Sequence, residues 1–570
     1  MGANMLISSL KIKNYRGLDI NIEKIEKVSI VIGQNDSGKT NICSAIMKVL
    51  DYNKRRIPFI VTDATNSNKE DIEIEITLTA DDLTNEQLAL VGNYIHVDSD
   101  KKYIKVKLIS KYNNDTLEYE DTLYYGNTDM DFEEVRINTQ TQLDKVLAIV
   151  YINPVYDIDV SKKEFFKFKE SDNKEKGIFF SDNIVQEISN LNTSIQNEEI
   201  VNEIQTDINE KGEFTELFED LTFKVSPNIK EENIYKSLNV TAHDNEDNEY
   251  DNIGDGKNKI FSMILKSKIY NDSKQKIFII EEPENHLYVL LQKVYISALL
   301  KMNPSQLIIT THSPYTIDFE KTNQIIKIGY NPSNKSREIY SFDGINNDDF
   351  KNFGYLINVE VAEMLYYNNV LLIEGDSEKY FYSLLMSKDN KFCKKINEKR
   401  FGIYAVNGIA FKTIKELLEK LGINVYIKTD NDIFKVPKIE EYRYAGLERC
   451  IKFLNNASKE ELKKLLNVEK LEFRFADKDS KLDIIENNIS EICKLLKKNN
   501  IIFSQHNEGF ERDFIEYIKL NTNNTVTDEA IYFLKQAKLK NLHYFIDEYN
   551  IDITTNDDNK KSVLVGFLYD

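Results

Sequence analysis

The chain has 570 residues, of which 41% are hydrophobic, and a formal net charge of −20. A chain this long predicts two or three domains, and its hydrophobic content is enough to build their cores. The acidic balance excludes a protein that simply coats nucleic acid, because phosphate contacts need Lys and Arg. It leaves room for a nuclease, whose metal ligands are themselves acidic.

Several features of the sequence favour a cytoplasmic protein. No stretch approaches ~18 uncharged apolar residues, and residues 1–17 lack the apolar segment of a signal peptide. The four cysteines, Cys43, Cys393, Cys450 and Cys493, are scattered without metal-binding spacing, which suits a reducing compartment. We therefore expect a cytoplasmic protein with free thiols and no membrane partner.

A phosphate-binding pattern lies near the start of the chain. Residues 33–40 fit G-x-x-x-x-G-K-[ST], between an apolar run that predicts a buried strand and a segment that predicts a helix. Backbone N–H groups of such a loop cradle phosphates, Lys39 reaches the β/γ-phosphates, and the Thr40 hydroxyl ligates Mg²⁺. The nucleotide-binding residues expected here are Gly33, Asn35, Gly38, Lys39, Thr40 and Asn41.

Strands are also predicted at Leu6–Asn14, Ile72–Leu78 and Ile104–Ile109, the last two from alternation of apolar and polar residues. Residues 160–244 are charged, rich in Asn and Glu, and mostly of helical pattern. We interpret them as a helical insertion, an arm or dimerisation element; a long surface excursion is the alternative. Turn-rich segments near 331–348 predict a boundary. The expected domains are residues 1–345 and 346–570.

Two further strand ends complete an ATPase pattern. The apolar strand Ile277–Ile280 ends in Glu281 and Glu282, and the strand Leu307–Thr310 leads into Thr-His-Ser-Pro with His312. A carboxylate at such a strand end can hold Mg²⁺ through water, which we assign to Glu281. The next carboxylate can polarise the attacking water, which we assign to Glu282. His312 is placed to touch the γ-phosphate and sense its loss.

This ordered set resembles the ABC-type ATPase heads of the SMC, RecF and overcoming-lysogenisation-defect (OLD) families, and residues 281–287 and 310–314 are particularly OLD-like. The resemblance implies ATP sandwiched between two protomers, with a signature loop reaching the γ-phosphate in trans. The matching loop contains Gly254 and Gly256. It lacks the usual Ser and carries Asp255, so slow turnover is expected, with ATP acting mainly as a switch or clamp. Arg16 matches the family's N-terminal Arg loosely.

Carboxylates follow two strands of the second half. Glu374 and Glu378 follow one apolar strand, and Asp430 and Asp432 follow another. On parallel strands these acids would emerge at the same carboxyl edge of a sheet. Several converging carboxylates repel one another unless a cation sits among them, and oxygen ligands select Mg²⁺ or Mn²⁺. A pair of such ions about 3.5–4 Å apart can cleave a phosphodiester.

The pattern hhhE-G-x-x-E followed by hhh-x-x-D-x-D resembles the Toprim domain of topoisomerases, primases and OLD nucleases, and residues 365–378 resemble the OLD junction. Gly408 stands where the family has a Gly-containing turn. The resemblance also implies a later Glu, matched by Glu511, and a C-terminal Lys near the scissile phosphate, matched by Lys561 or its neighbour Lys560. The expected metal and catalytic residues here are Glu374, Glu378, Asp430, Asp432, Glu511 and Lys561.

The predicted fold is α/β: an ABC-type ATPase head with a helical insertion, followed by a Rossmann-like, parallel-sheet Toprim domain with helical additions. The resemblance implies an ATP-binding, Mg²⁺- or Mn²⁺-dependent DNA endonuclease in anti-phage defence. It implies a homodimer or higher even-numbered oligomer and a partner encoded nearby, either a helicase, as in a Gabija-like system, or a reverse transcriptase with its RNA. An ATPase clamp of RecF type, a Toprim topoisomerase and an effector that cuts RNA stay open as alternatives.

Overall fold

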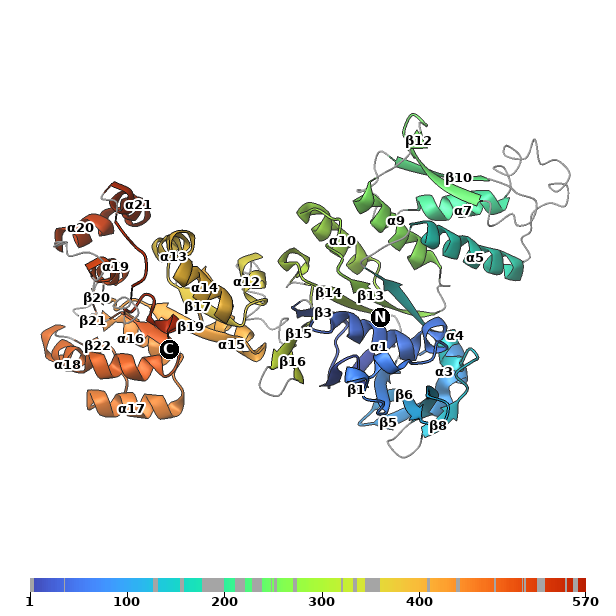
Figure 1. The fold of residues 1–570 in the computed structure, drawn as a ribbon, viewed down its shortest axis with the longest axis horizontal. Coiled ribbons are helices and arrows are strands. Elements are labelled where there is room, and N and C mark those ends of the chain that lie inside the picture. The colour runs from blue at the N-terminus through green and yellow to red at the C-terminus, as the bar shows by residue number, and fades with distance from the viewer. Residues whose placement is uncertain are drawn as a thin grey trace. The chain divides into compact units, whose positions relative to one another are not determined.

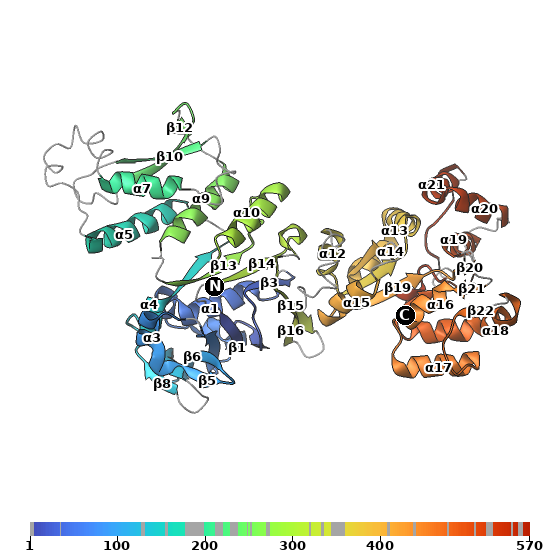
Figure 2. The same cartoon turned by 180° about the vertical axis from the view of Figure 1, so that it is seen from behind.

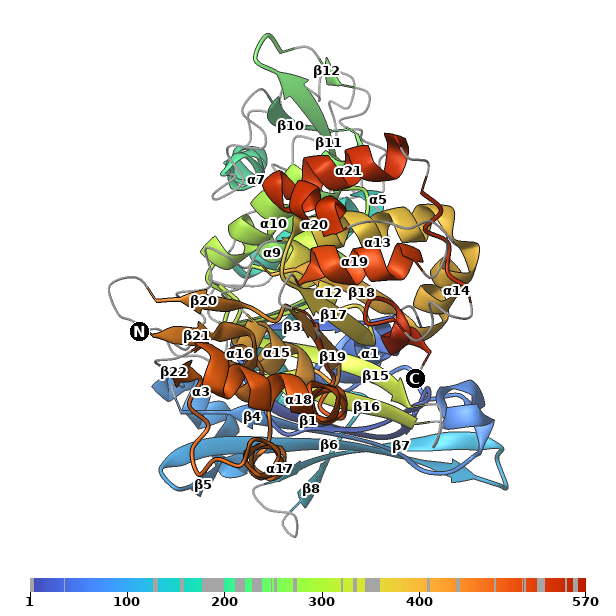
Figure 3. The same ribbon diagram turned by 90° about the vertical axis from the view of Figure 1, so that its left-hand side faces the viewer.

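The computed structural model divides the chain into two compact units, Met1–Val359 and Glu360–Asp570, which are described separately. The ribbon is drawn from three sides in Figures 1, 2 and 3. The structure describes all residues except 1–4, 35, 82, 127–131, 154–157, 177–198, 211–220, 228–237, 248, 251–253, 270–273, 319–320, 332–335, 344–358, 407–410, 437–440, 476–477, 505, 507–508, 520–527, 549–550, 557–561 and 570.

A six-stranded sheet of order β16-β15-β3-β14-β13-β9 forms the centre of the first unit. Its strands are parallel except that β16 pairs antiparallel with β15. Alternate residues of one strand serve two cores, because Ile277 and Ile279 point into one apolar cluster and Phe278 and Ile280 into the other. The strands are β3 (Val28–Gly33), β9 (Leu147–Ile152), β13 (Gln275–Glu281), β14 (Gln306–Thr311), β15 (Gln324–Asn331) and β16 (Ser336–Phe342).

Helix α1 (Lys39–Leu50) lies between this sheet and an antiparallel sheet of order β2-β1-β4-β6-β7-β8, with β5 beside β6. Its apolar side chains share one buried cluster with both sheets, which fixes the helix and therefore the loop before it. The antiparallel strands are β1 (Ile7–Tyr15), β2 (Leu18–Ile22), β4 (Ile72–Thr79), β5 (His96–Asp98), β6 (Lys101–Asn113), β7 (Glu118–Gly126) and β8 (Phe132–Val135). Short helices α2 (Tyr52–Arg55), α3 (Asn85–Val91) and α4 (Gln142–Val146) connect them.

The other face of the six-stranded sheet is covered by helices. They are α5 (Ile158–Lys176), α7 (Glu199–Asn209), α9 (Asp255–Lys268) and α10 (Val289–Lys301). The segment 160–244 was expected to be helical, and the structure differs there. It contains strands β10 (Leu221–Pro227) and β11 (Leu238–Asp244), which form a small antiparallel sheet with β12 (Glu249–Tyr250). Both strands alternate apolar and polar residues, a period that the surrounding charge obscured.

The second unit is built on a parallel sheet of order β18-β17-β19-β23. The strands are β17 (Asn369–Ile373), β18 (Phe401–Ala405), β19 (Asn424–Thr429) and β23 (Ile501–Phe503). A small antiparallel sheet joins β20 (Ile433–Lys435), β21 (Tyr442–Tyr444) and β22 (Arg474–Phe475). The central strands β17 and β19 are neighbours, so their carboxyl ends open at one edge.

Helices pack around this sheet in two apolar clusters. Side chains of α13 (Asp376–Lys388), α14 (Asn390–Lys399), α19 (Phe510–Lys519), α20 (Asp528–Gln536) and α21 (Lys538–Glu548) form one cluster. Side chains of α16 (Ala445–Ile451), α17 (Asn456–Leu466) and α18 (Lys478–Lys497) form the other with β23. Helices α12 (Val359–Met364) and α15 (Phe411–Lys420) complete the unit. Among the described residues, no helix combines the length and apolar character that crossing a membrane requires.

Candidate functional site

The phosphate loop joins β3 to α1, as the sequence predicts. The ammonium of Lys39 donates to the carbonyls of Gly33 and Gln34 at 3.0 and 2.9 Å, so it lies folded over the loop. Burial lowers the pKa of Lys39 to about 8, against the attraction of nearby carboxylates, chiefly Glu282. At Gly38, φ is 108°, a left-handed conformation that favours glycine and starts the helix. The loop can therefore hold phosphate with backbone N–H groups and one cation.

Glu281 lies at the end of β13, beside this loop. Only 1% of it is exposed, and its Oε2 accepts a hydrogen bond of 2.8 Å from the Tyr151 hydroxyl. Burial raises the pKa of Glu281, and hydrogen bonding from Tyr151 and Thr40 opposes that rise. Glu281 and Thr40 therefore present oxygen atoms to the same space, which suits a hydrated Mg²⁺.

Glu282 and His312 face one another at the ends of neighbouring strands. His312 Nε2 lies 3.2 Å from Glu282 Oε1, and Asn285 Nδ2 donates to Oε2 of the same carboxylate at 2.8 Å. The backbone of Glu282 has φ of 43°, which is uncommon outside glycine and asparagine. Residues held in such conformations cluster at functional sites, where the surrounding structure enforces them.

Two side chains stabilise the backbone of the turn that carries Glu282. Lys259 of α9 is 0% exposed and donates to the carbonyls of Glu282, Pro283 and Asn285 at 2.9, 3.3 and 3.1 Å. Glu284 accepts from the backbone N–H groups of His312 and Ser313 at 2.6 and 3.1 Å.

The helix of Lys259 begins at the loop that matches a signature sequence. Gly254 has φ of 78°, and a Cβ at Gly256 would lie 3.1 Å from the carbonyl oxygen of His286. That close approach favours glycine at this position. The loop and the turn after Glu282 are thus packed against each other within one chain.

In the second unit, Glu374 at the end of β17 and Asp430 at the end of β19 meet. Glu374 Oε1 accepts from the Asp430 N–H at 2.9 Å and from the Thr429 hydroxyl. Arg449 of α16 pairs with Glu374 Oε1 at 2.8 Å and with Asp432 Oδ2 at 2.7 Å. Burial raises the pKa of Glu374, and the charge of Arg449 opposes that rise.

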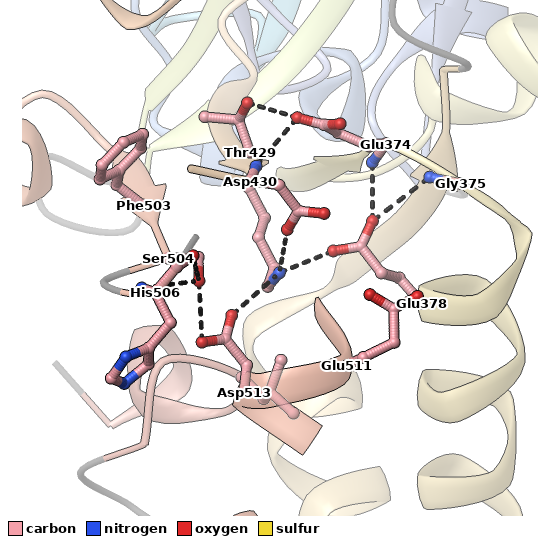
Figure 4. A network of polar contacts seen from close by, with 12 residues as sticks. Glu374, Gly375, Glu378, Thr429, Asp430, Phe503, Ser504, His506, Glu511 and Asp513 are labelled. Atoms are coloured by element: carbon pink, nitrogen blue, oxygen red, sulfur yellow. Dashed lines mark hydrogen bonds and ion pairs between the residues drawn. The ribbon is translucent and has the colours of Figure 1, made fainter. Parts of the chain in front are cut away.

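A buried lysine, Lys428, lies among the next group of acids. Figure 4 labels these acids, Glu378, Asp430 and Asp513. The ammonium of Lys428 is 2.7 Å from Glu378 Oε1, 3.6 Å from Asp430 Oδ1 and 3.5 Å from Asp513 Oδ2. The other oxygen of Glu378 accepts from the N–H groups of Glu374 and Gly375 at 2.8 and 3.2 Å. Both oxygens of Glu378 are therefore engaged within the protein.

Helix α19 contributes Glu511 and Asp513, whose side chains point toward the same group of acids in Figure 4. Lys538 of α21 lies 3.6 Å from Glu511 Oε1. Burial raises the pKa of Asp513 to about 6, although Lys428 lowers it. Gly509 stands at the start of this helix, and a Cβ there would lie 2.5 Å from Asp430 Oδ2, which indicates how closely the loop approaches the acids.

The donor chemistry fits a divalent cation. Asp430 Oδ1, Glu511 Oε1 and Asp513 Oδ2 are buried without a hydrogen-bond partner, and the ammonium groups near them lie 3.5 to 3.6 Å away. Such hard oxygen atoms suit Mg²⁺ or Mn²⁺. Within the described part of the chain, no three His, Cys, Asp or Glu side chains form a complete metal-binding group. Lys428 and Arg449 hold the carboxylates in ion pairs instead.

Two family models match this chain. Residues 5–317, more than half of the chain, match the model of the AAA ATPase domain, and residues 365–432 match the model of the overcoming lysogenization defect protein-like TOPRIM domain. The chain belongs to the family of proteins with an AAA-type ATPase domain. It combines an AAA-type ATPase domain with a TOPRIM domain, and it is an enzyme of the endonuclease class.

Two curated relatives are both named Endonuclease GajA. The one from Bacillus cereus strain VD045 is 28% identical over 487 residues, which cover 80% of each chain. The one from Bacillus cereus strain HuB5-5 is 23% identical over 543 residues, covering 75% of this chain and 77% of the relative.

Solved structures of SMC heads also align with this chain, at 14% identity. An SMC head bound to the C-terminal winged-helix domain of ScpA has a TM-score of 0.42 over 60% of this chain and 99% of the other. The SMC head from Thermotoga maritima has a TM-score of 0.31 over 58% and 97%. Both scores are below 0.5, so the fold assignment rests on the family matches and the sheet topology.

The structure brings together most of the residues that the sequence singled out. Thr40, Lys39, Glu281, Glu282 and His312 surround the phosphate loop. Asn41 donates to the carbonyl of Arg16, and Arg16 itself pairs with Asp63 at 2.7 Å. Four expected residues, Asn35, Gly408, Lys560 and Lys561, lie outside the described residues.

Several residues at the two candidate sites were not predicted from the sequence. They are Lys259, Glu284, Arg337, Lys428, Arg449, Asp513 and Lys538. One signal was available for Lys428, since a lysine inside an otherwise buried strand needs an acidic partner. Glu284 and Asp513 lie two residues beyond predicted site residues. Lys259, Arg337, Arg449 and Lys538 are brought in by segments distant in sequence, as Arg337 of β16 is when it donates to the Asp36 carbonyl at 3.1 Å.

Proposed function

We propose that this OLD-family chain is an ATP-binding, Mg²⁺- or Mn²⁺-dependent DNA endonuclease. The observation that carries the proposal is the convergence of Glu374, Asp430 and Asp432 at the carboxyl edge of β17 and β19. The two relatives named as endonucleases support it.

Roles follow from the contacts. Glu374, Asp430, Asp432 and Glu511 would hold the divalent cation, because Glu374 and Asp432 each have an oxygen paired with the charge of Arg449, and Asp430 and Glu511 each have a buried oxygen without a hydrogen-bond partner. A bound cation supplies charge stabilisation to the phosphodiester and lowers the pKa of water. Glu378 is assigned a positioning role instead of the ligand role expected from sequence, since its carboxylate caps the turn at Gly375 and pairs with Lys428.

The test is cleavage of plasmid DNA with and without chelator. Nicking or linearisation is expected with Mg²⁺ or Mn²⁺ and is expected to vanish in EDTA, because no protein cation can replace the Lewis acid. A tRNA substrate run beside the plasmid distinguishes an RNA-cutting effector. Persistent DNA cleavage in EDTA contradicts the metal assignment, and cleavage of tRNA alone contradicts the substrate assignment.

ATP binding is tested by Lys39→Met. The change removes the one ammonium folded over the phosphate loop. Charge-assisted hydrogen bonds are worth about 1.5–3 kcal/mol, so the Kd for ATP should rise roughly 10- to 100-fold. Calorimetric titration of ATP measures it, and the exposed Lys54→Met is the control. Unchanged affinity in a folded Lys39→Met protein would show that residues 33–40 do not bind the nucleotide.

Assembly and biological role are proposed from the same resemblance. We place ATP between two protomers, with the loop at Gly254 and Gly256 reaching the partner's γ-phosphate, and expect a dimer or higher even-numbered oligomer. The similarity of this chain to a protein named Endonuclease GajA supports a role as a defence effector against phage, acting beside a partner encoded nearby. Light scattering with and without ATP measures the assembly.

A further inference from the structure

Lys428 and Arg449, two of the cations that pair with the acids of the TOPRIM domain, differ in accessibility. The side chain of Lys428 is 0% exposed and lies among three carboxylates. The side chain of Arg449 is 26% exposed, and its partners Glu374 and Asp432 are 20% and 43% exposed. Lys428 is thus enclosed as a permanent counter-charge, whereas Arg449 lies at the open side of the pocket.

Arg449 pairs with the two carboxylates that end the two central strands. One guanidinium nitrogen lies 2.8 Å from Glu374 and 2.7 Å from Asp432. The same nitrogen donates to the Asp430 carbonyl at 3.1 Å, and Nε donates to the Thr429 hydroxyl at 3.1 Å. A divalent cation that binds Glu374 Oε1 and Asp432 Oδ2 must therefore compete with this guanidinium.

We propose that Arg449 is an exchangeable cation: it neutralises Glu374 and Asp432, and a divalent ion that takes those carboxylates releases it to bind a DNA phosphate. The inference rests on the proposed metal-dependent nuclease. Planar guanidinium suits both partners, because carboxylate and phosphate each accept two parallel N–H groups. A free guanidinium beside a bound metal ion would be repelled by it, and the phosphate of a substrate removes that repulsion. Metal loading and DNA binding are thereby coupled through one side chain.

Metal affinity is the first readout. Arg449→Met removes the competing charge and leaves both carboxylates, so the Kd for Mn²⁺ alone, measured by calorimetric titration, should fall about tenfold, equivalent to about 1.4 kcal/mol. Arg443→Met is the matched control: Arg443 also pairs with one carboxylate, Glu448, but it touches none of the acids of the pocket. Its Mn²⁺ affinity should equal that of the unchanged protein.

DNA affinity is the second readout. In Ca²⁺, the slope of log K against log salt for a DNA duplex should be smaller by about 1 in Arg449→Met, as expected for one lost phosphate contact. In EDTA the slopes of Arg449→Met and the unchanged protein should agree, because the guanidinium is then paired with the acids. A merely structural arginine would not produce a metal-dependent difference in slope.

The possible outcomes distinguish a failure of the proposed exchange from a failure of the proposed function. Equal or weaker Mn²⁺ binding in folded Arg449→Met, with Mn²⁺ bound by the unchanged protein, overturns the exchange and leaves the proposed function intact. Absence of Mn²⁺ binding in every protein overturns the proposed metal-dependent nuclease, and the exchange with it. If Arg449→Met fails to fold, Arg449→Lys is the test instead. A single ammonium pairs less well with two carboxylates than a guanidinium does, so this substitution should also tighten Mn²⁺ binding.

Discussion

Asp430→Asn is expected to reduce the rate of DNA cleavage by about a thousandfold, the largest effect on activity foreseen for a single residue. Its Oδ1 is buried without a hydrogen-bond partner, 3.6 Å from Lys428, and its backbone N–H fixes Glu374. The amide keeps the shape but removes the negative charge that a divalent cation needs, and losing such electrostatic stabilisation costs 10²–10³ or more in rate. A quantitative plasmid-nicking assay in Mg²⁺ measures it.

The matched control for that substitution is Asp376→Asn. Asp376 is exposed, two residues beyond Glu374, in the first turn of α13. Its substitution also removes one carboxylate from the neighbourhood, so it reports on net charge alone, and cleavage should change by less than about threefold. Full activity of Asp430→Asn would remove this acid from the nuclease site, and equal loss in both variants would point to a general charge effect.

Lys428→Met is expected to destabilise the second unit by about 3–5 kcal/mol, because it leaves Glu378, Asp430 and Asp513 buried without their counter-charge. Thermal and urea unfolding of the full chain measure the loss. Lys379→Met serves as the control: it removes a 2.7 Å ion pair to Glu360 that is 41% exposed on both sides, and should cost less than about 1 kcal/mol.

The defect in Lys428→Met should depend on pH in a defined direction. Burial raises the pKa of Asp513 to about 6 from 3.8, so the folded state holds this proton more tightly than the unfolded state. That contribution to stability is present at low pH and is lost as the pH rises through about 6. The destabilisation should therefore be larger at pH 7.5 than at pH 5, and equal destabilisation at both pH values contradicts the charge explanation.

Adding Glu378→Gln to Lys428→Met should restore part of the stability, because it removes one of the unpaired negative charges. A double variant that is no more stable than Lys428→Met also contradicts the charge explanation.

Much of the fold could be predicted because its signals are local. The strand before Gly33, the helix after it, and the strands that end in Glu281 and Glu374 follow from short apolar runs with polar residues at their ends. Acids placed after neighbouring parallel strands must emerge at one edge, so the meeting of Glu374 with Asp430 followed from topology alone.

The remaining features depend on contacts between distant segments. Nothing near Arg449 indicates that α16 returns its guanidinium to Glu374, and nothing near Lys259 indicates three carbonyl partners at the turn after Glu281. Glu378 shows that one spacing can fit two roles. Its spacing from Glu374 predicts a metal ligand, which stays a prediction, and the same spacing places it at the third position of a helix, where a Glu caps the backbone.

The ammonium of Lys428 also has a consequence for how the protein matures in the cell. A buried cluster made only of acids would stay unfolded until divalent ions bound to it, and newly made chains would be exposed to proteases until then. Since Lys428 is enclosed among three carboxylates, the acids are neutralised as the chain folds. Changes in the Mg²⁺ concentration should then alter the fraction of the enzyme that is active without altering the amount of enzyme that escapes proteolysis.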